Sequence, residues 1–321
     1  MLFLLASCIM AFIVALSLTR MIIPRLVRAG ITGGDENKEG SPQVAEMGGI
    51  GIVAGFSAGL LLAIFFNSFL GMQFNLAYIL AAVITIHTIA FIGIVDDLLS
   101  IPQWLKAILP LFAAVPLVAM NAAGSTAIGI PLLGMVDFGI VYVFVLIPLA
   151  IAVCSNLTNM LAGFNGMEAG MGAVMFATLS LLAWNNGATE MAILSLSMMG
   201  ALLGFLFLNH FPARVFPGDV GTLTIGVVLA STVIIGNLES AGVILMIPYI
   251  IDFFIKAKNR FPHTHQEIKD GKLLPKDGKV RGFVHLAMRA FGGLSEKNLV
   301  LFFIALESAF ALIALALYFR I

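Results

Sequence analysis

The sequence predicts an all-α, polytopic membrane protein of about ten transmembrane helices, organised as one domain over residues 1–321. Three observations predict this class. The chain of 321 residues is 60% hydrophobic and only 11% charged. Its mean hydropathy is +1.07. Its apolar residues gather in runs long enough to cross a bilayer, and a soluble domain could not bury so much apolar surface.

The expected spans follow these runs, because a crossing needs about 20 apolar residues. They cover residues 2–22, 48–70, 75–95, 104–121, 137–157, 167–184, 190–208, 220–236, 241–257 and 298–319. Several contain proline, which neighbouring membrane helices accommodate. The segment "GNLESAG" at 236–242 separates two spans that could otherwise be read as one.

Basic residues fix the expected orientation. When the loops are assigned alternately to two sides, one side receives every Lys and Arg except Arg320. The positive-inside rule makes that side cytoplasmic and places both termini outside the cytoplasm. The first apolar run has basic residues after it and none before it, which is the reverse of a secretory signal.

Charge and cysteine content argue against several classes of function. A net charge of zero leaves no basic footprint for nucleic acid. Cys8 and Cys154 lie in or near apolar runs and predict neither a disulfide framework nor a metal site. A polytopic transporter, kept as an alternative, would be expected to show an inverted repeat or a polar site at mid-membrane. Neither is evident, and no nucleophile suggests a lipid phosphatase.

Polar residues concentrate in the loops on the expected cytoplasmic side. These loops contain "GGDENKEGSPQVAEMGG" (33–49), "GIVDDLLSIPQWLKAI" (93–108), "SNLTNMLAGFNGMEAG" (155–170), "NHFPARVFPGDVGT" (209–222) and "NRFPHTHQEI" (259–268). The opposite loops are short and chemically plain. The arrangement indicates chemistry between a water-soluble substrate and a molecule in the lipid.

Each polar feature also has an ordinary structural explanation. Asp96 and Asp97 end a helix, where acids can be solvated caps, and Asp219 lies near a helix N-terminus, where a carboxylate is favourable. Asn and Gly in the 155–170 loop are common turn residues. His87 and Glu307, inside spans, are expected to hydrogen-bond between helices.

The combination is more informative than its parts. Carboxylates with asparagine oxygens suit Mg²⁺, which prefers hard oxygen ligands and keeps substrate phosphates in its shell. Lysine, histidine and glycine-rich turns suit a diphosphate. His263 and His265 do not predict a zinc site, because residues at i and i+2 point apart.

These motifs, taken together, resemble those of a known family. "GIVDDLLSIPQWLKAILP", "NLTNMLAGFNGMEAG", "FPARVFPGD" and the "HTH" loop are similar, in order and spacing, to the signatures of the polyprenyl-phosphate N-acetylhexosamine-1-phosphate transferases. "GDENK", "RVFPGD" and "GGLSEKNLVL" resemble the eukaryotic and archaeal dolichyl-phosphate branch, which uses UDP-GlcNAc. The resemblance covers essentially the whole chain.

The resemblance implies the reaction and its partners. An N-acetylhexosamine-1-phosphate, expected to be GlcNAc-1-phosphate, passes from a UDP-sugar to a polyprenyl or dolichyl phosphate in the membrane, and UMP leaves. This would be the first membrane step of lipid-linked glycan synthesis for N-glycosylation. The alternative is a bacterial-type undecaprenyl-phosphate transferase for cell-wall or surface polysaccharide. A multi-pass protein of a prokaryotic, archaeal plasma membrane is expected, and a homodimer is compatible with the sequence.

The resemblance also implies roles for residues. Asp219 and Asn159 would hold Mg²⁺, with Mn²⁺ as an alternative, and Lys106 would stabilise the phosphates. Asp96 and Asp97 would position or deprotonate the lipid phosphate. The residues expected to bind the nucleotide sugar are Lys38, Glu46, Asn165, Glu168, Phe216, His263 and His265. Among these, Asn165 would read uracil, Phe216 would stack on it, Glu46 would approach the ribose, and the histidines would face the diphosphate and sugar.

The segment 259–297 is the longest cytoplasmic loop, and the resemblance makes it a sugar-selecting lid. "KLLPKDGKVRG" predicts a hairpin with Asp-Gly in its turn. "FVHLAMRAF" predicts a short amphipathic helix ended by Gly292 and Gly293. Eukaryotic members carry arginines on both sides of a histidine where this chain has "HTH". The N-acetylated sugar therefore stays open, as does whether Arg260 or Arg281 supplies the positive charge.

Overall fold

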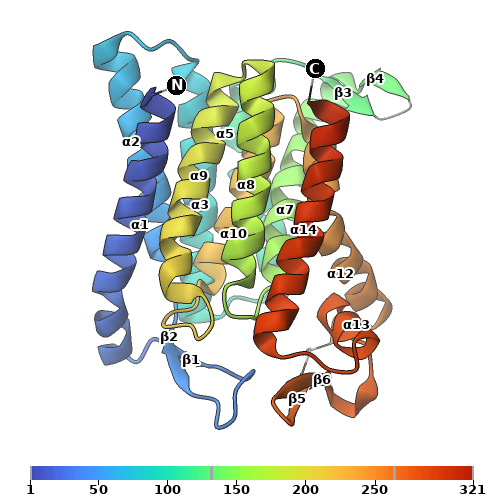
Figure 1. Cartoon of the computed structure of the whole chain (residues 1–321). Coiled ribbons are helices and arrows are strands. Elements are labelled where there is room, and N and C mark those ends of the chain that lie inside the picture. The colour runs from blue at the N-terminus through green and yellow to red at the C-terminus, as the bar shows by residue number, and fades with distance from the viewer. Residues whose placement is uncertain (1, 131–132, 263–264, 320–321) are drawn as a thin grey trace.

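The computed structural model describes residues 2–130, 133–262 and 265–319, which form a bundle of long helices (Figure 1). The predicted all-α membrane class is confirmed, because eight helices in the described chain are long and apolar enough to cross a membrane. They are α1 (Leu2–Arg28), α2 (Gly49–Leu70), α3 (Leu76–Leu99), α6 to α7 (Gly139–Met160), α8 (Met167–Asn186), α9 (Thr189–Asn209), α10 (Gly218–Ile235) and α14 (Glu296–Tyr318).

Two of the ten expected spans have a different form. Residues 104–121 contribute α4 (Gln103–Ala113) and α5 (Val115–Ala119), a shorter apolar segment. Residues 241–257 contribute α11 (Glu239–Leu245) and α12 (Ile247–Lys258), which are bent by 61° and make a ninth span if counted as one. Pro248 is the second residue of α12, and proline cannot continue the hydrogen bonds of a preceding helix.

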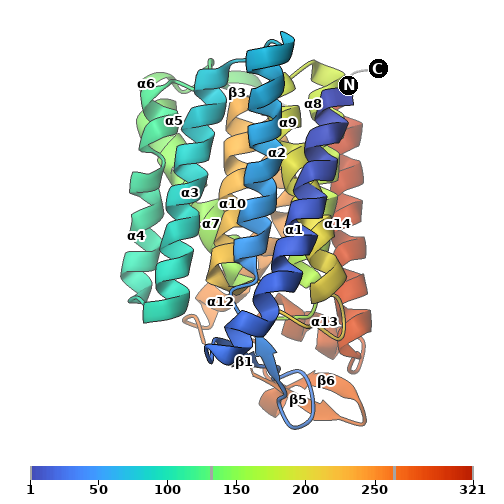
Figure 2. The ribbon, with the colours of Figure 1, turned by 90° about the vertical axis from the view of Figure 1, so that its left-hand side faces the viewer.

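Three antiparallel hairpins lie at the ends of the bundle. They are β1 (Thr32–Gly34) with β2 (Gln43–Ala45), β3 (Ala127–Ile130) with β4 (Gly134–Asp137), and β5 (Gln266–Lys269) with β6 (Lys272–Pro275). The first and third hairpins share one end with α13 (Phe283–Ala290), whereas β3 and β4 share the other with the start of α1 and the end of α14 (Figures 1 and 2). The polar loops therefore gather at one end.

The turn predicted for a hairpin within "KLLPKDGKVRG" is wrong. The observed hairpin pairs β5 with β6 and turns at Asp270–Gly271, just before this segment, with φ of +51° and +70°. Asp277–Gly278 instead belongs to a short 3-10 turn after β6. Both Asp-Gly pairs suit a tight turn, and the pairing of Ile268 with Leu273 selects the first. The predicted α13 is confirmed, and positive φ at Gly292 and Gly293 follows its end.

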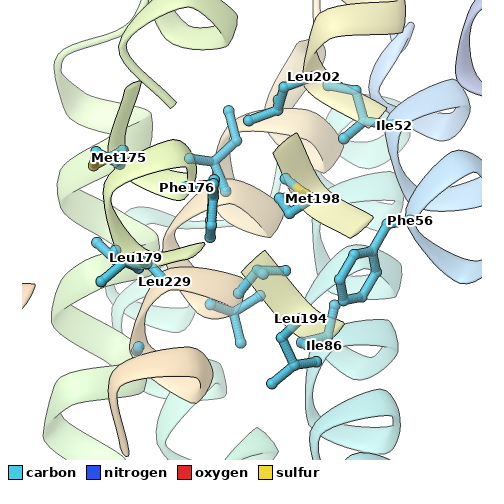
Figure 3. Packing of buried hydrophobic residues seen from close by; sticks show 14 of the residues in the cluster. Ile52, Phe56, Ile86, Met175, Phe176, Leu179, Leu194, Met198, Leu202 and Leu229 are labelled. Carbon is cyan, nitrogen blue, oxygen red and sulfur yellow. The ribbon is translucent and has the colours of Figure 1, made fainter. Parts of the chain in front are cut away.

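The core surrounds α10, which packs against α2, α3, α7 and α9. Figure 3 shows side chains of α2, α3, α8, α9 and α10 packed together there. They include Ile52, Phe56, Ile86, Met175, Phe176, Leu179, Leu194, Met198, Leu202 and Leu229. Close packing of this kind fixes the helices relative to one another.

A glycine lets α3 approach α10 closely. A Cβ atom added to Gly93 would lie 2.5 Å from the Cα of Val220. This contact places the end of α3 against the first turn of α10. Deeper in α3, His87 bonds Ser57 of α2 at 2.8 Å, so its predicted inter-helix bond is confirmed. Glu307 is buried without a hydrogen-bond partner in the described residues, so that expectation was wrong.

Candidate active site

The N-terminus of α10 is capped by a carboxylate from a neighbouring helix. Asp97 accepts hydrogen bonds from the backbone N–H groups of Asp219 at 2.7 Å and Val220 at 3.1 Å. Gly218 has φ of +65°, and a Cβ there would lie 2.6 Å from Asp97 Oδ2. The first turn of a helix offers free N–H groups that favour a carboxylate. Asp97 thus fixes the backbone of Asp219.

Asp96, Lys106 and Asp219 form an acid–lysine centre. Lys106 Nζ donates to Asp219 Oδ2 at 2.5 Å and also pairs with Asp96 Oδ2. Asp96 Oδ1 accepts the backbone N–H of Ile101 at 3.1 Å, in the turn between α3 and α4. The short loop therefore returns Lys106 to the acids.

Asn159 joins this centre from the end of α7. Its Nδ2 donates to Asp219 Oδ1 at 2.6 Å and to Thr222 Oγ1 at 2.9 Å. Each Asp219 oxygen thus has a side-chain partner, one from α4 and one from α7. Four elements meet at this carboxylate, although their residues are far apart in the sequence.

The donor set fits a divalent cation bound together with phosphate. In the described parts of the chain, no group of three or more His, Cys, Asp or Glu could hold a metal alone. Mg²⁺ commonly takes only one or two carboxylates and completes its shell with substrate phosphates and water. Asp96 and Asp219 already converge on one cation, the Lys106 ammonium. Asn159 could add a carbonyl oxygen.

A polar cavity of about 350 Å³ opens on one side of Asp219. It is lined by Gly34, Asp35, Glu36, Asn37, Glu46, Ala162, Gly163, Phe164, Glu168, Asn209, Phe216, Pro217, Gly218, Asp219, Thr222 and Gln266. Three residues predicted to bind the nucleotide sugar are among them. Burial and the negative charge of Asp219 raise the pKa of one of these, Glu46.

Asn165 lies behind the cavity rather than in its lining. Its Nδ2 donates to Asp35 Oδ2 at 3.0 Å, and its backbone N–H donates to Glu296 Oε1 at 2.8 Å. Lys38 pairs with Asp35 and lies 4.9 Å from the centre of the Phe211 ring. Both predicted residues therefore belong to one network around two buried acids, Asp35 and Glu296.

Glu168 and Phe216 both line the cavity and each holds a neighbouring segment of backbone. Glu168 Oε1 accepts the backbone N–H of Gly163 at 2.5 Å and so holds the turn after α7. The Phe216 backbone donates to the Ala45 carbonyl at 2.8 Å, which ties the start of α10 to β2. The Phe216 side chain lines the cavity, where a planar ring could stack.

The lid hairpin reaches the β1–β2 loop across the cavity. Gln266 Nε2 bonds Asn37 Oδ1, and Asn37 Nδ2 donates to the Gly163 carbonyl at 2.7 Å. His265 is largely exposed, and its Nδ1 lies 3.9 Å from Glu36 Oε2. His263 lies outside the described residues. The structure thus brings His265 to the cavity rim.

Sequence reasoning missed several members of the site. Asp35, Asn37, Thr222, Gln266 and Glu296 all contact or line it. Asp35 and Asn37 lie in "GDENK" and Glu296 in "GGLSEKNLVL", two stretches that carried the resemblance. The sequence did contain a signal for them, because charged residues in such short motifs need polar partners once they are buried.

A second, mostly apolar groove of about 950 Å³ opens on the other side of the acid–lysine centre. It runs between α4, α7 and α12, and includes Leu111, Leu149, Val153, Ile250 and Phe254. Lys106, Asn159 and Lys256 give it a polar end. The contacts of Asp219 with Lys106 and Asn159 therefore join an apolar groove to a polar cavity.

This fold and site define a multi-pass membrane protein with a charged centre between a polar cavity and an apolar groove. The model of glycosyl transferase family 4 matches residues 78–237. This match includes α3, α4, α7 and the start of α10, which carry the acid–lysine centre.

Similar proteins extend the match over almost the whole chain. Relatives from Sulfolobus acidocaldarius and Saccharolobus solfataricus are 37% and 34% identical, over 97% and 96% of this chain and 94% and 95% of their own. A Dictyostelium discoideum relative is 28% identical over 90% of this chain and 83% of its own. The third is named UDP-N-acetylglucosamine–dolichyl-phosphate N-acetylglucosaminephosphotransferase, and the first two carry that name provisionally. The chain belongs to glycosyl transferase family 4.

Proposed function

We propose that this protein transfers GlcNAc-1-phosphate from UDP-GlcNAc to a dolichyl or other polyprenyl phosphate and releases UMP. One observation carries the proposal: the Asp219–Lys106 pair, at 2.5 Å, stands between a polar cavity and an apolar groove. A nucleotide sugar suits the first space and a prenyl chain the second. The names of the three relatives support this pair of substrates.

The reaction exchanges one phosphoanhydride bond for another. An oxygen of the lipid phosphate attacks the phosphorus that carries the sugar. The bond from that phosphorus to the bridging oxygen of UMP breaks, and UMP keeps the electron pair. Because a phosphate monoester has a second pKa near 6, much of the attacking group is dianionic at neutral pH. Positioning therefore matters more than proton removal.

The residues of the acid–lysine centre have different roles in this reaction. Lys106, at the polar end of the groove, attracts the lipid phosphate and stabilises negative charge in the transition state. Asp219 and Asn159, with Asp96, would hold Mg²⁺ or Mn²⁺, which would supply charge neutralisation of the diphosphate. Asp97 keeps Asp219 in place through the backbone. Phe216 and Glu46 face the nucleotide in the cavity.

We propose that the site faces the cytoplasm and that both termini lie outside it. The start of α1 and the end of α14 lie at the end of the bundle opposite the lid (Figure 1). Together with the basic residues, which the expected topology assigns to the lid side, this supports extracytoplasmic termini and a cytoplasmic site. The resemblance and the archaeal relatives support an archaeal plasma membrane and a place at the first lipid-linked step of N-glycosylation.

A transfer assay tests the function. Membranes containing the protein are incubated with a polyprenyl phosphate, Mg²⁺ and one radiolabelled donor at a time, and the lipids are extracted. Label from UDP-GlcNAc should enter the lipid phase and UMP should appear in equal amount. Transfer from UDP-MurNAc-pentapeptide alone would instead establish the bacterial-type alternative, and label that enters vesicles without lipid product would establish transport.

A further inference from the structure

Two residues of α12 connect the lid to the acid–lysine centre. Asp252 is fully buried, and its Oδ1 accepts the backbone N–H of Phe283 at 2.7 Å. Its Oδ2 pairs with Lys256 Nζ at 2.8 Å, one helical turn away. Phe283 is the first residue of α13, so Asp252 caps the lid helix from outside the lid.

Lys256 continues the connection to α7. Its ammonium donates to the backbone carbonyl of Met160, the last residue of α7. A carbonyl at a helix C-terminus has no partner within its helix, and a cation there is favourable. Met160 directly follows Asn159, whose side chain bonds Asp219. The chain of contacts therefore runs from Phe283 to Asp219.

The same cap controls the position of the lid hairpin. After α13, Leu294 pairs with Leu273 of β6, with a backbone hydrogen bond of 2.8 Å from Leu273 N–H to the Leu294 carbonyl. The partner strand, β5, carries Gln266 at the polar cavity. Phe283 itself packs edge-to-face on Phe303 of α14, with 5.2 Å between ring centres. Fixing α13 therefore fixes the cavity rim.

We propose that the ion pair of buried Asp252 and partly buried Lys256 forms a strut that couples the lid, residues 259–297, to the last turn of α7, and so positions both halves of the site. Asp252 lines neither the cavity nor the groove, whereas Lys256 also borders the polar end of the groove. The strut goes beyond the proposed transfer reaction, because it assigns positioning residues outside the acid–lysine centre. It predicts that loosening the lid disturbs Asn159. It also predicts that binding of one substrate changes the affinity for the other through α12.

The first test measures structure rather than turnover, so it does not depend on the proposed function. Lys256→Met removes the charge, and Lys258→Met is the matched control, because Lys258 is exposed on the same helix. Backbone hydrogen exchange of the purified protein in detergent should become at least about ten-fold faster at Phe283 and Val284 in Lys256→Met only. Unchanged exchange there, or equal acceleration in Lys258→Met, would overturn the strut.

The second test uses turnover. Lys256→Met should lower kcat about 10- to 100-fold, the range seen when groups supporting a site are lost, with KM for UDP-GlcNAc raised. Lys256→Arg, which keeps a cation for Asp252 and Met160, should restore most of kcat. Asp252→Asn is measured in both ways as well, because Asp252 lines neither the cavity nor the groove. The amide keeps an acceptor for Phe283 but loses the charge, so this variant should show the same faster exchange and lower kcat. Wild-type kcat in a folded variant would contradict the proposal, whereas failure of the transfer reaction in wild-type protein would count against the proposed function alone.

Discussion

The Asp97 carboxylate accepts the backbone N–H of Asp219 at 2.7 Å, across the contact between α3 and α10. The second acid of the pair therefore acts on the first turn of α10, whereas Asp96 pairs with Lys106. Two adjacent aspartates in "VDD" have different partners, because neighbouring helical residues point about 100° apart. The expected role of Asp97 toward the lipid phosphate stays a prediction.

Asp97→Asn should reduce both stability and turnover. The amide keeps one oxygen acceptor but loses the charge and one of the two N–H contacts, so stability should fall by about 1 kcal/mol, as for other helix caps. Turnover should fall further, because Asp219 loses its fixed position. Thermal unfolding and kcat measured on the same purified sample check both effects. Normal kcat per folded molecule would reduce Asp97 to a simple cap.

Lys106→Ala and Asp219→Asn should each cost several kcal/mol of transition-state stabilisation, the scale of lost electrostatic contacts in an active site. Since the two side chains touch at 2.5 Å, the double variant should cost much less than the sum. The Mg²⁺ concentration giving half-maximal activity should also rise in Asp219→Asn. Additive costs would show that the two residues act independently.

Gly93→Ala tests the close approach of α3 to α10. In an ordinary helix this change stabilises by about 1 kcal/mol. Here the new Cβ would meet backbone 2.5 Å away, so the change should destabilise by about 1–3 kcal/mol. It should also lower kcat by moving Asp97. Thr88→Ala, at an exposed position on the same helix, serves as the control. A stabilised Gly93→Ala protein would refute this contact.

Glu46 predicts a pH effect of defined sign. Burial and Asp219 raise the pKa of Glu46 above the unfolded value of about 4.3, so the native protein holds this proton over a pH interval in which the unfolded chain has released it. Stability therefore falls as pH rises through that interval. Glu46→Gln should remove this fall, which makes the variant relatively more stable at neutral pH. Tm followed against pH checks this, and parallel curves would contradict it.

Cysteine labelling tests the orientation. In a background with Cys8 and Cys154 replaced by Ser, Lys272→Cys places a thiol on the exposed part of β6, and Met135→Cys places one on β4 at the other end. An impermeant maleimide added to intact cells should label Met135→Cys and spare Lys272→Cys until the membrane is opened. Labelling of Lys272→Cys without permeabilisation would reverse the assigned topology.

The sequence by itself determined the features that depend on local composition. Apolar runs placed eight crossing helices correctly, because a bilayer requires about 20 apolar residues wherever they lie in a chain. The break at "GNLESAG" and the start of a helix at "GD" could also be predicted, because both depend only on residues next to each other in the chain. The motifs indicated Asp96, Lys106, Asn159 and Asp219 as one group, and the fold brings them into contact.

Only the tertiary structure decided what each side chain touches. It assigned Asp97 to the α10 backbone, Asn165 to a network behind the cavity, and Asp252 with Lys256 to the link between the lid and α7. It also chose Asp270–Gly271 over Asp277–Gly278 as the hairpin turn. Hydropathy describes one segment at a time, whereas these contacts depend on how closely two helices approach. At α3 and α10 that distance is set by the missing Cβ of Gly93, and its consequence appears only once the helices are packed.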